Sequence, residues 1–271
     1  MSGALFESAG EEQWVATEFA RGPWDPRACH GGPVAALLAR AVERADPDST
    51  IDWQVSRLTV ELTQPVPVGR DLTITTEVER PGKRVSLIAG RLTDCDTEVA
   101  RVRALRIRKQ AMAFPPETVR TNDVVPRSPD GVATQRVTWA VGDGPAFHTH
   151  GSEHRFTEGT WEQPGPVAVW IRLRVPLVEG EAPTGVQRAA AAADFGNGVS
   201  TGLPYDGFTF INPDLTVSLV RPPVGEWIGM RTATHYGDVA VSTGAGFAES
   251  ELFDLDGRIG RSVQMLFIDQ R

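Results

Sequence analysis

The sequence is poor in cysteine, in excess positive charge and in long apolar runs, and each shortage excludes a class of protein. Its two cysteines, Cys29 and Cys95, are too few for a disulfide framework and are typical of a reducing compartment. Acidic residues outnumber basic ones by 35 to 27, which disfavours a surface that binds nucleic acid. No apolar run approaches the ~18 residues of a membrane span, and the first residues lack a secretion signal. We therefore expect a cytoplasmic protein with no membrane span and no nucleic-acid partner.

One segment of the chain occurs twice. The sequence LTVELTQPVPVG begins at Leu58, and LTVSLVRPPVG begins at Leu215, an offset of 157 residues. Each is an alternating strand followed by prolines and a glycine, and each copy ends in a further strand, over residues 101–107 and 261–268. Two copies in the same order predict a duplicated domain, because a solenoid needs three or more. The 271 residues are thereby interpreted as two copies of one fold.

Each copy is predicted to contain one helix followed by four long strands. Apolar residues at helical spacing predict a helix over 33–45, and an alanine run predicts its counterpart over 184–195. The strands are expected at 53–62, 71–79, 85–94 and 98–108, and at 208–219, 226–236, 239–253 and 258–268. This pattern indicates an α+β unit in which an antiparallel sheet wraps a long helix. We expect domains at 1–113 and 132–271, joined by a proline-rich linker at 114–131.

Five short motifs in this order resemble the acyl-CoA thioesterase II-like family. They are HGGPVAALLARA from His30, VWIRLR from Val169, AADFG from Ala192, NPDLTVSLVRPP from Asn212 and DLDGRIGRSVQ ending at Gln264. The resemblance covers most of the chain. It implies a tandem double hotdog fold and hydrolysis of an acyl-CoA to free acid and coenzyme A. In that family an Asp, a Ser or Thr and a Gln orient and deprotonate a water molecule.

Carried onto this chain, the resemblance implies that Asp194, Asn212 and Gln264 are the catalytic residues. Asn212 stands where the family has Ser or Thr. An amide cannot exchange donor and acceptor roles as a hydroxyl can, so either the efficiency of hydrolysis or the identity of the substrate stays open. Asp194 is unusual without the resemblance, because a carboxylate near a helix C-terminus opposes the helix dipole. The alternative for Asn212 is a turn opener before Pro213, and for Gln264 an outward strand residue.

The start of the first helix supplies the other half of the predicted site. His30, Gly31 and Gly32 offer backbone N–H groups that can polarise a thioester carbonyl, although two glycines also permit close packing. Aligning the two copies places Gln264 opposite Arg103, Asp214 opposite Arg57 and Asp194 opposite Ala41. The second copy then holds polar groups that the first lacks, which predicts one working site per chain.

No cofactor motif and no convincing metal site are present. His148, His150 and His154 are interpreted as a solvated strand end, not as metal ligands, and Cys29 is interpreted as inert. Two other functions remain open: a non-catalytic acyl-CoA-binding scaffold, and an enoyl-CoA hydratase, whose Asp/His pair could use only His235 from the second copy. Exposed sheet edges favour a homo-oligomer. The length of the acyl chain stays open, because the alanine-rich helix could line a tunnel or pack tightly.

Overall fold

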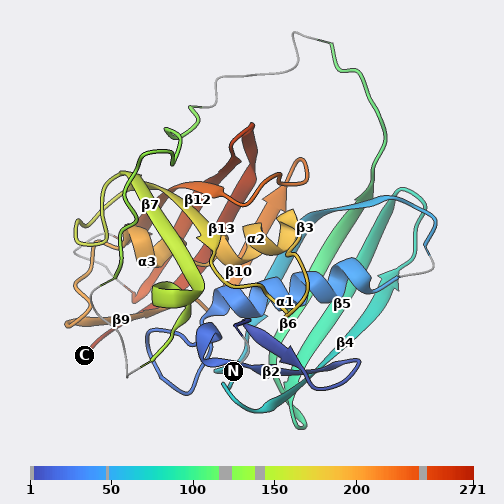
Figure 1. Cartoon of the computed structure of the whole chain (residues 1–271), viewed down its shortest axis with the longest axis horizontal. Coiled ribbons are helices and arrows are strands. Elements are labelled where there is room, and N and C mark those ends of the chain that lie inside the picture. The colour runs from blue at the N-terminus through green and yellow to red at the C-terminus, as the bar shows by residue number, and fades with distance from the viewer. Residues whose placement is uncertain (1–2, 47–48, 116–123, 138–143, 238–242) are drawn as a thin grey trace.

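The structure is a computed structural model that describes residues 3–46, 49–115, 124–137, 144–237 and 243–271. One antiparallel sheet runs through the described residues, in the strand order β1-β2-β4-β5-β6-β3-β10-β13-β12-β11-β8-β7, with β9 paired to β13. The strands are β1 Phe6–Ser8, β2 Gln13–Ala16, β3 Trp53–Leu62, β4 Asp71–Arg80, β5 Val85–Asp94, β6 Thr97–Arg108, β7 Ser152–Glu158, β8 Val167–Leu173, β9 Phe208–Ile211, β10 Asp214–Leu219, β11 Ile228–Tyr236, β12 Ala245–Asp254 and β13 Gly257–Gln270. The sheet curves around two central helices (Figure 1).

The two copies meet at strands β3 and β10, which form the centre of the sheet. Thr59 lies directly opposite Thr216, and their hydroxyl oxygens are 3.3 Å apart. These two residues are separated by the same 157 positions as the repeated segments. A pseudo-twofold axis therefore passes between them, and the strand order reads equivalently outward from this pair in both directions. The duplication expected from the repeat and the tandem double hotdog implied by the resemblance are confirmed.

Two helices lie side by side on the inner face of the sheet (Figure 1). Helix α1 spans Gly31–Arg44 and helix α2 spans Gly185–Ala193, followed by the short helix α3, Gly196–Ser200. Thr184 and Gln187 form a capping box at the start of α2. The helices approach closely, since a Cβ added at Gly32 would lie 2.6 Å from the carbonyl oxygen of Ala191. Glycine at this position is thus required by helix packing.

The predicted strands of the first copy agree with β3, β4, β5 and β6 to within a residue. The second copy differs at the predicted strand 208–219, which is broken into β9 and β10. Asn212 and Pro213 lie between them, and proline cannot donate to a sheet ladder. The predicted strand 239–253 begins at positions that are not described, and β12 begins at Ala245. Part of the expected linker, 116–123, is likewise outside the described residues, so the domain boundaries remain predictions.

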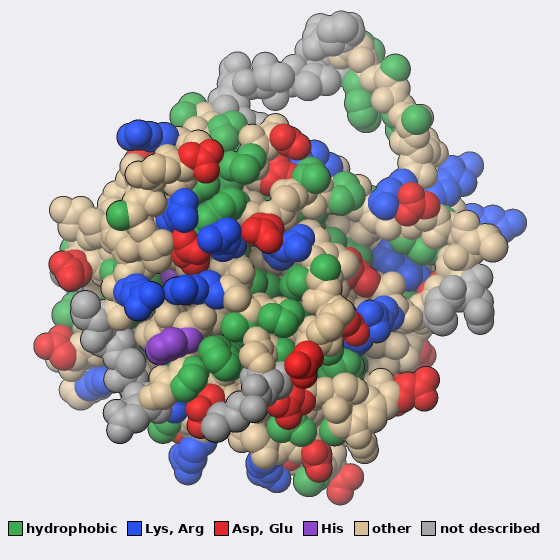
Figure 2. Space-filling view, in the orientation of Figure 1, with side chains coloured by type: hydrophobic (Ala, Val, Ile, Leu, Met, Phe, Trp, Pro, Cys, Tyr) green, Lys and Arg blue, Asp and Glu red, His purple; other side chains and the backbone are tan. Residues whose placement is uncertain are grey.

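The N-terminal strands β1 and β2 tie the first copy to the second. The backbone N–H of Leu5 donates to the carbonyl of Pro176 at 3.0 Å, and that of Phe6 donates to Leu177 at 2.9 Å. On the face drawn in Figure 2, acidic and basic side chains are interspersed. Among the described residues, no helix is long and apolar enough to cross a membrane.

Candidate active site

A cavity of about 430 Å³ lies where the start of α1 meets the turn between α2 and α3. Residues from both copies line it. His30, Gly31 and Val34 come from the first copy, and Asp194 and Asn212 from the second. The first copy also supplies the segment 62–66. The structure therefore brings together most of the residues that the sequence predicts for the site.

Asp194 is the buried carboxylate of this cavity. It forms the C-cap of α2, and only 3% of its side chain is exposed. One oxygen, Oδ2, lies 2.7 Å from Nδ1 of His30, and the other, Oδ1, accepts a hydrogen bond from the Asn212 amide at 2.7 Å. A buried carboxylate is stable only with such partners. Both oxygens are held in place, and the carboxylate faces the cavity.

His30 is the N-cap of α1, and its ring joins the two copies of the fold. Its Nδ1 lies 2.7 Å from Asp194 and also 3.1 Å from the backbone nitrogen of Gly32. A single nitrogen cannot donate to Asp194 and accept from Gly32 at once. The shorter contact is to a carboxylate, which only accepts, so we assign the proton to Nδ1. The N–H of Gly32 points toward the same nitrogen.

Asn212 sits at the break between β9 and β10. Its Nδ2 donates to Oδ1 of Asp194 at 2.7 Å and lies 3.4 Å from the carbonyl oxygen of Asp214. Because the carboxylate of Asp194 accepts hydrogen bonds, the NH₂ group and not the oxygen must face it. This orientation leaves the amide oxygen of Asn212 as an acceptor beside the carboxylate.

Gln264 supports the turn that carries Asp194 and does not itself line the cavity. It is 2% exposed, on strand β13. Its Oε1 accepts from the backbone N–H of Asn197 at 3.0 Å, and its Nε2 lies 3.4 Å from the carbonyl oxygen of Asp194. The amide thus bridges the two ends of the turn 194–197. The outward strand position considered for this residue is wrong.

The two glycines at the start of α1 have different surroundings. Gly31 lines the cavity, and a Cβ at this position would lie 2.8 Å from both carboxylate oxygens of Asp194. Gly32 instead faces α2 through Ala191. Close packing therefore accounts for Gly32, whereas at Gly31 the absence of a side chain is what admits the carboxylate to the helix start.

A second cavity of about 390 Å³ occupies the pseudo-twofold-related position. Its lining includes Val55, which precedes Asn212 by the repeat offset of 157 residues, and Val186 from the start of α2. Valine has no polar group to replace the Asn212 amide. The buried guanidinium of Arg106, paired with Asp46 at 3.1 Å, also lines this cavity. The related cavity therefore lacks the groups that surround Asp194.

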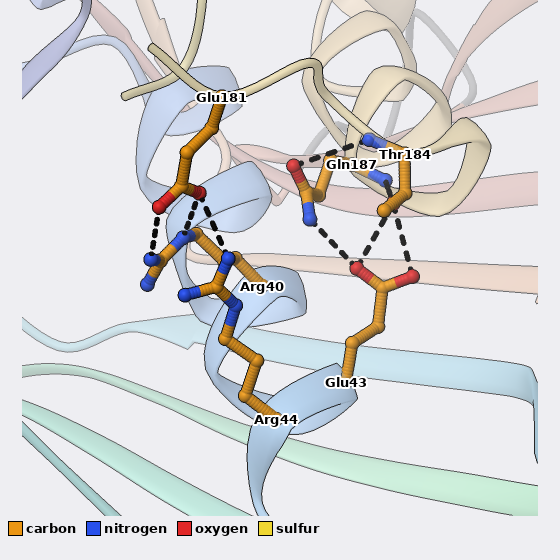
Figure 3. Close-up of polar contacts among 6 residues, drawn as sticks. All are labelled: Arg40, Glu43, Arg44, Glu181, Thr184 and Gln187. Atoms are coloured by element: carbon orange, nitrogen blue, oxygen red, sulfur yellow. Dashed lines mark hydrogen bonds and ion pairs between the residues drawn. The ribbon is translucent and has the colours of Figure 1, made fainter. Parts of the chain in front are cut away.

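Near the end of α1, Glu43 reaches the start of α2 (Figure 3). Thr184 caps α2 as His30 caps α1, and its hydroxyl lies 2.9 Å from both carboxylate oxygens of Glu43. The side-chain amide of Gln187 donates to the same carboxylate at 2.8 Å. Burial raises the pKa of Glu43, and the bonds from Gln187 and Thr184 oppose this. Both of these partners come from the start of α2, and neither of them is an imidazole.

The structure corrects two of the sequence alignments between the copies. By its contact with the N-cap of the other helix, Asp194 corresponds to Glu43 and not to Ala41. In the sheet, Thr59 pairs with Arg103 and Thr216 pairs with Val263. Gln264 therefore corresponds to the residue after Arg103, which is Ala104. The first copy does hold a carboxylate, and its partners are a hydroxyl and the Gln187 amide, with no imidazole.

The histidines of HTHGSEH are buried, so their interpretation as a solvated strand end is wrong for two of the three. His148 and His154 are 4% and 2% exposed. Burial lowers the pKa of each to about 3, with smaller contributions from neighbouring positive groups, so both are neutral near pH 7. Among the described residues, no group of three potential ligands could hold a metal ion.

Two further candidates from the sequence lie in unreactive surroundings. Burial raises the pKa of the Cys29 thiol to about 12, so the reactive thiolate is not formed near pH 7. The only second-copy histidine considered for an Asp/His pair, His235, stacks on Phe247 and lies 3.3 Å from Glu249. The histidine that does pair with Asp194 is His30. Sequence reasoning missed this pair because it joins residues from different copies.

Two family models match the chain, in the order of the two copies. The acyl-CoA thioesterase N-terminal domain matches residues 20–107, and the acyl-CoA thioesterase C-terminal domain matches residues 116–268. A search of the curated proteins found no match.

Solved structures share the fold over nearly the whole chain. A proposed thioesterase from Novosphingobium aromaticivorans has a TM-score of 0.71 at 17% identity, covering 97% of this chain and 98% of its own. A proposed thioesterase II from Thermobifida fusca has a TM-score of 0.71 at 16% identity, covering 97% and 95%. An acyl-CoA thioesterase II from Mycobacterium marinum has a TM-score of 0.64 at 12% identity, covering 98% and 95%.

Proposed function

The chain belongs to the acyl-CoA thioesterase family, and we propose that it hydrolyses an acyl-CoA with a water molecule that Asp194 deprotonates. The observation that carries this proposal is the buried carboxylate of Asp194, which is held between His30 and Asn212 and faces the cavity. Such a group is in hydrogen-bond reach of a water molecule in the cavity, as a general base must be. The family's thioester hydrolase activity thus has a site in this chain.

The geometry of Asn212 orients the attacking water. Its amide oxygen and the carboxylate of Asp194 are neighbouring acceptors, joined by the 2.7 Å bond from Nδ2. A water molecule that donates one hydrogen to each keeps a lone pair free for the thioester carbon. Asn212 then performs the accepting half of the role that a hydroxyl performs in the family, without needing to rotate.

The start of α1 stabilises the charge that forms on the carbonyl oxygen. The N–H groups of Gly31 and Gly32 are at the positive end of the helix dipole, and Gly31 lines the cavity. Water transfers a proton to Asp194 as its oxygen bonds to the carbonyl carbon. The carbon–sulfur bond then breaks, and the proton on Asp194 passes to the departing coenzyme A sulfur, giving free acid and thiol.

Gln264 acts as a positioning residue in this scheme. Its amide links the backbone of Asp194 to that of Asn197 and fixes the turn on which the carboxylate is carried. We expect Gln264→Leu to lower kcat more than it raises KM, because the cavity wall is not formed by this side chain.

The proposal is tested by release of free thiol from acyl-CoA substrates. Asp194→Asn keeps the shape and removes the base, so kcat should fall by roughly 10² to 10⁴. The matched control is Glu43→Gln, which alters the pseudo-twofold-related carboxylate and should change kcat less than about twofold. A folded Asp194→Asn protein with unchanged thiol release would overturn the role of Asp194.

The His30–Asp194 pair also favours a second candidate, hydration of an enoyl-CoA. That reaction needs an Asp/His pair, and the 2.7 Å contact supplies one. Loss of enoyl absorbance without thiol release would establish it, whereas thiol release establishes the esterase. Binding of acyl-CoA with neither signal would establish the non-catalytic scaffold. The homo-oligomer and the cytoplasmic location remain predictions.

A further inference from the structure

The walls of the active-site cavity indicate which acyl group it accepts, an inference that rests on the proposed thioesterase function. Aromatic side chains are concentrated there: Trp24, Trp161, Phe195, Tyr205 and Phe210 all line this cavity. The whole chain has 11 Phe, 7 Trp and 2 Tyr, so a quarter of its aromatic residues surround one ligand site.

Packed rings form the cavity wall next to Asp194. Phe195 stacks on Phe147 with ring centres 5.3 Å apart and an interplanar angle of 24°. His154 meets the same ring edge-on at 4.6 Å, and Trp161 packs against His154 at 4.9 Å. The rings of Phe147 and His154 thus pack against Phe195, the residue that follows Asp194. An acyl chain that passes Asp194 therefore soon meets a solid aromatic wall.

The interface between α1 and α2 is also tightly packed. The alanines of α2 from Ala189 to Ala193 are at most 2% exposed, and none of them lines the cavity. Gly32 lies against the backbone of Ala191 with no room for even a methyl group. The sequence left open whether the alanine-rich helix lines an acyl tunnel or packs tightly. In the structure these alanines pack tightly and do not line the cavity.

The cavity of about 430 Å³ must admit the thioester and the end of the pantetheine arm together with the acyl group.

A second group of rings also lines the cavity. Trp24 meets Phe210 edge-on at 5.1 Å, and Tyr205 lies 5.1 Å from Phe210. Burial raises the pKa of Tyr205, so it is a neutral phenol, and its hydroxyl donates to the carbonyl of Gly198 at 2.5 Å. Both groups of rings therefore contribute apolar surface to the same cavity as Asp194.

We infer that the acyl group of the substrate is compact and aromatic. Aromatic rings attract one another in offset and edge-on arrangements, beyond the burial of apolar area that an aliphatic group also gains. A rigid ring also loses less conformational freedom on binding than a flexible chain of the same carbon number. Phe195 and Trp161 are the rings that face such a group beyond the carboxylate.

The experiment compares acyl-CoA substrates with the same number of acyl carbons. Phenylacetyl-CoA, cyclohexylacetyl-CoA and octanoyl-CoA each carry eight, and palmitoyl-CoA serves as the long chain. We expect kcat/KM to be highest for phenylacetyl-CoA, by roughly tenfold over octanoyl-CoA and more over palmitoyl-CoA. Equal or faster hydrolysis of octanoyl-CoA or palmitoyl-CoA by the wild-type enzyme overturns the inference, and Asp194→Asn shows separately whether the proposed reaction fails.

A variant of the wall tests the aromatic contribution itself. Trp161→Leu should lower the ratio of phenylacetyl-CoA to cyclohexylacetyl-CoA hydrolysis by about fivefold, because the aromatic partner is lost while apolar surface remains. The control is Trp227→Leu, whose ring lies under Arg155 and Arg172 and does not line the cavity. That variant should keep the wild-type ratio. An unchanged ratio in a folded Trp161→Leu protein contradicts the assignment of this wall.

Discussion

Mild acid should destabilise this protein through its two buried histidines. His148 and His154 are 4% and 2% exposed, and burial lowers the pKa of each from 6.5 to about 3. His30, Arg21 and His150 face His148 and lower its pKa further. In the unfolded chain both imidazoles become protonated as the pH falls through 6.5, whereas in the folded protein they stay neutral until about pH 3.

The sign and size of the effect follow from this difference. A depressed pKa contributes stability that is fully present above pH 6.5 and is lost as the pH falls toward 3. Each pH unit in this window costs about 1.4 kcal/mol per histidine. Between pH 6.5 and 5 the two together should remove about 4 kcal/mol, a large part of the 5–15 kcal/mol by which a typical protein is stable. Glu153 and Asp254, whose pKa values are lowered in the fold, act only at lower pH.

Urea unfolding at a series of pH values measures this slope. Replacing one of the two, His154→Phe, keeps a ring against Trp161 and Phe195 and should halve the loss of stability between pH 6.5 and 5. The control His235→Phe changes a side chain that is 45% exposed and should keep the full slope. If the wild-type protein and His154→Phe lose stability equally over this range, the buried neutral imidazole is not the cause.

Three further substitutions test the site and its support. Gly31→Ala introduces a methyl group 2.8 Å from both oxygens of Asp194. Thiol release should slow at least about tenfold while the circular dichroism stays native. Unchanged turnover would show that the start of α1 shifts to accommodate the methyl group. Asn212→Leu removes the amide on the carboxylate and should lower kcat by roughly tenfold, with a smaller change in KM, as steady-state kinetics would show. Arg221→Leu leaves the fully buried Asp254 without its guanidinium partner and should cost about 3 kcal/mol in urea unfolding at neutral pH, whereas a stability within 1 kcal/mol of wild type would mean that Asp254 is neutral.

Much of the architecture was predictable because the repeat is a physical constraint on the chain. A 157-residue offset between two alternating strands implies equivalent strands, and equivalent edge strands of two copies can pair about a twofold axis. Thr59 and Thr216 do so. Strands β1 and β2, of three and four residues, were not predicted because segments this short have no clear alternation.

The site was less predictable, because its contacts join residues that are distant in the chain. Asp194 and Asn212 could be found from local motifs on the second copy. The pairing of Asp194 with His30 depends on how α2 packs against α1, which local periodicity does not specify. The polar sequence around His148 likewise suggested a solvated segment, whereas the fold buries His148 and His154, and His154 lies against the rings of Trp161 and Phe195.

The asymmetry of the two copies has a simple origin in their helix starts. At one end of the helix pair the cap is His30 and the acid is Asp194, and at the other the cap is Thr184 and the acid is Glu43. Thr184 and Gln187 form the capping box that stabilises the start of α2, and both also hydrogen-bond to the carboxylate of Glu43. Neither of these side chains lines the cavity beside Glu43. The imidazole and Asn212 instead hold Asp194 while leaving an acceptor and a backbone N–H beside it. Both helix ends thus carry a carboxylate, and the two differ in the residues that contact them; in the proposed function the end at Asp194 carries the reaction.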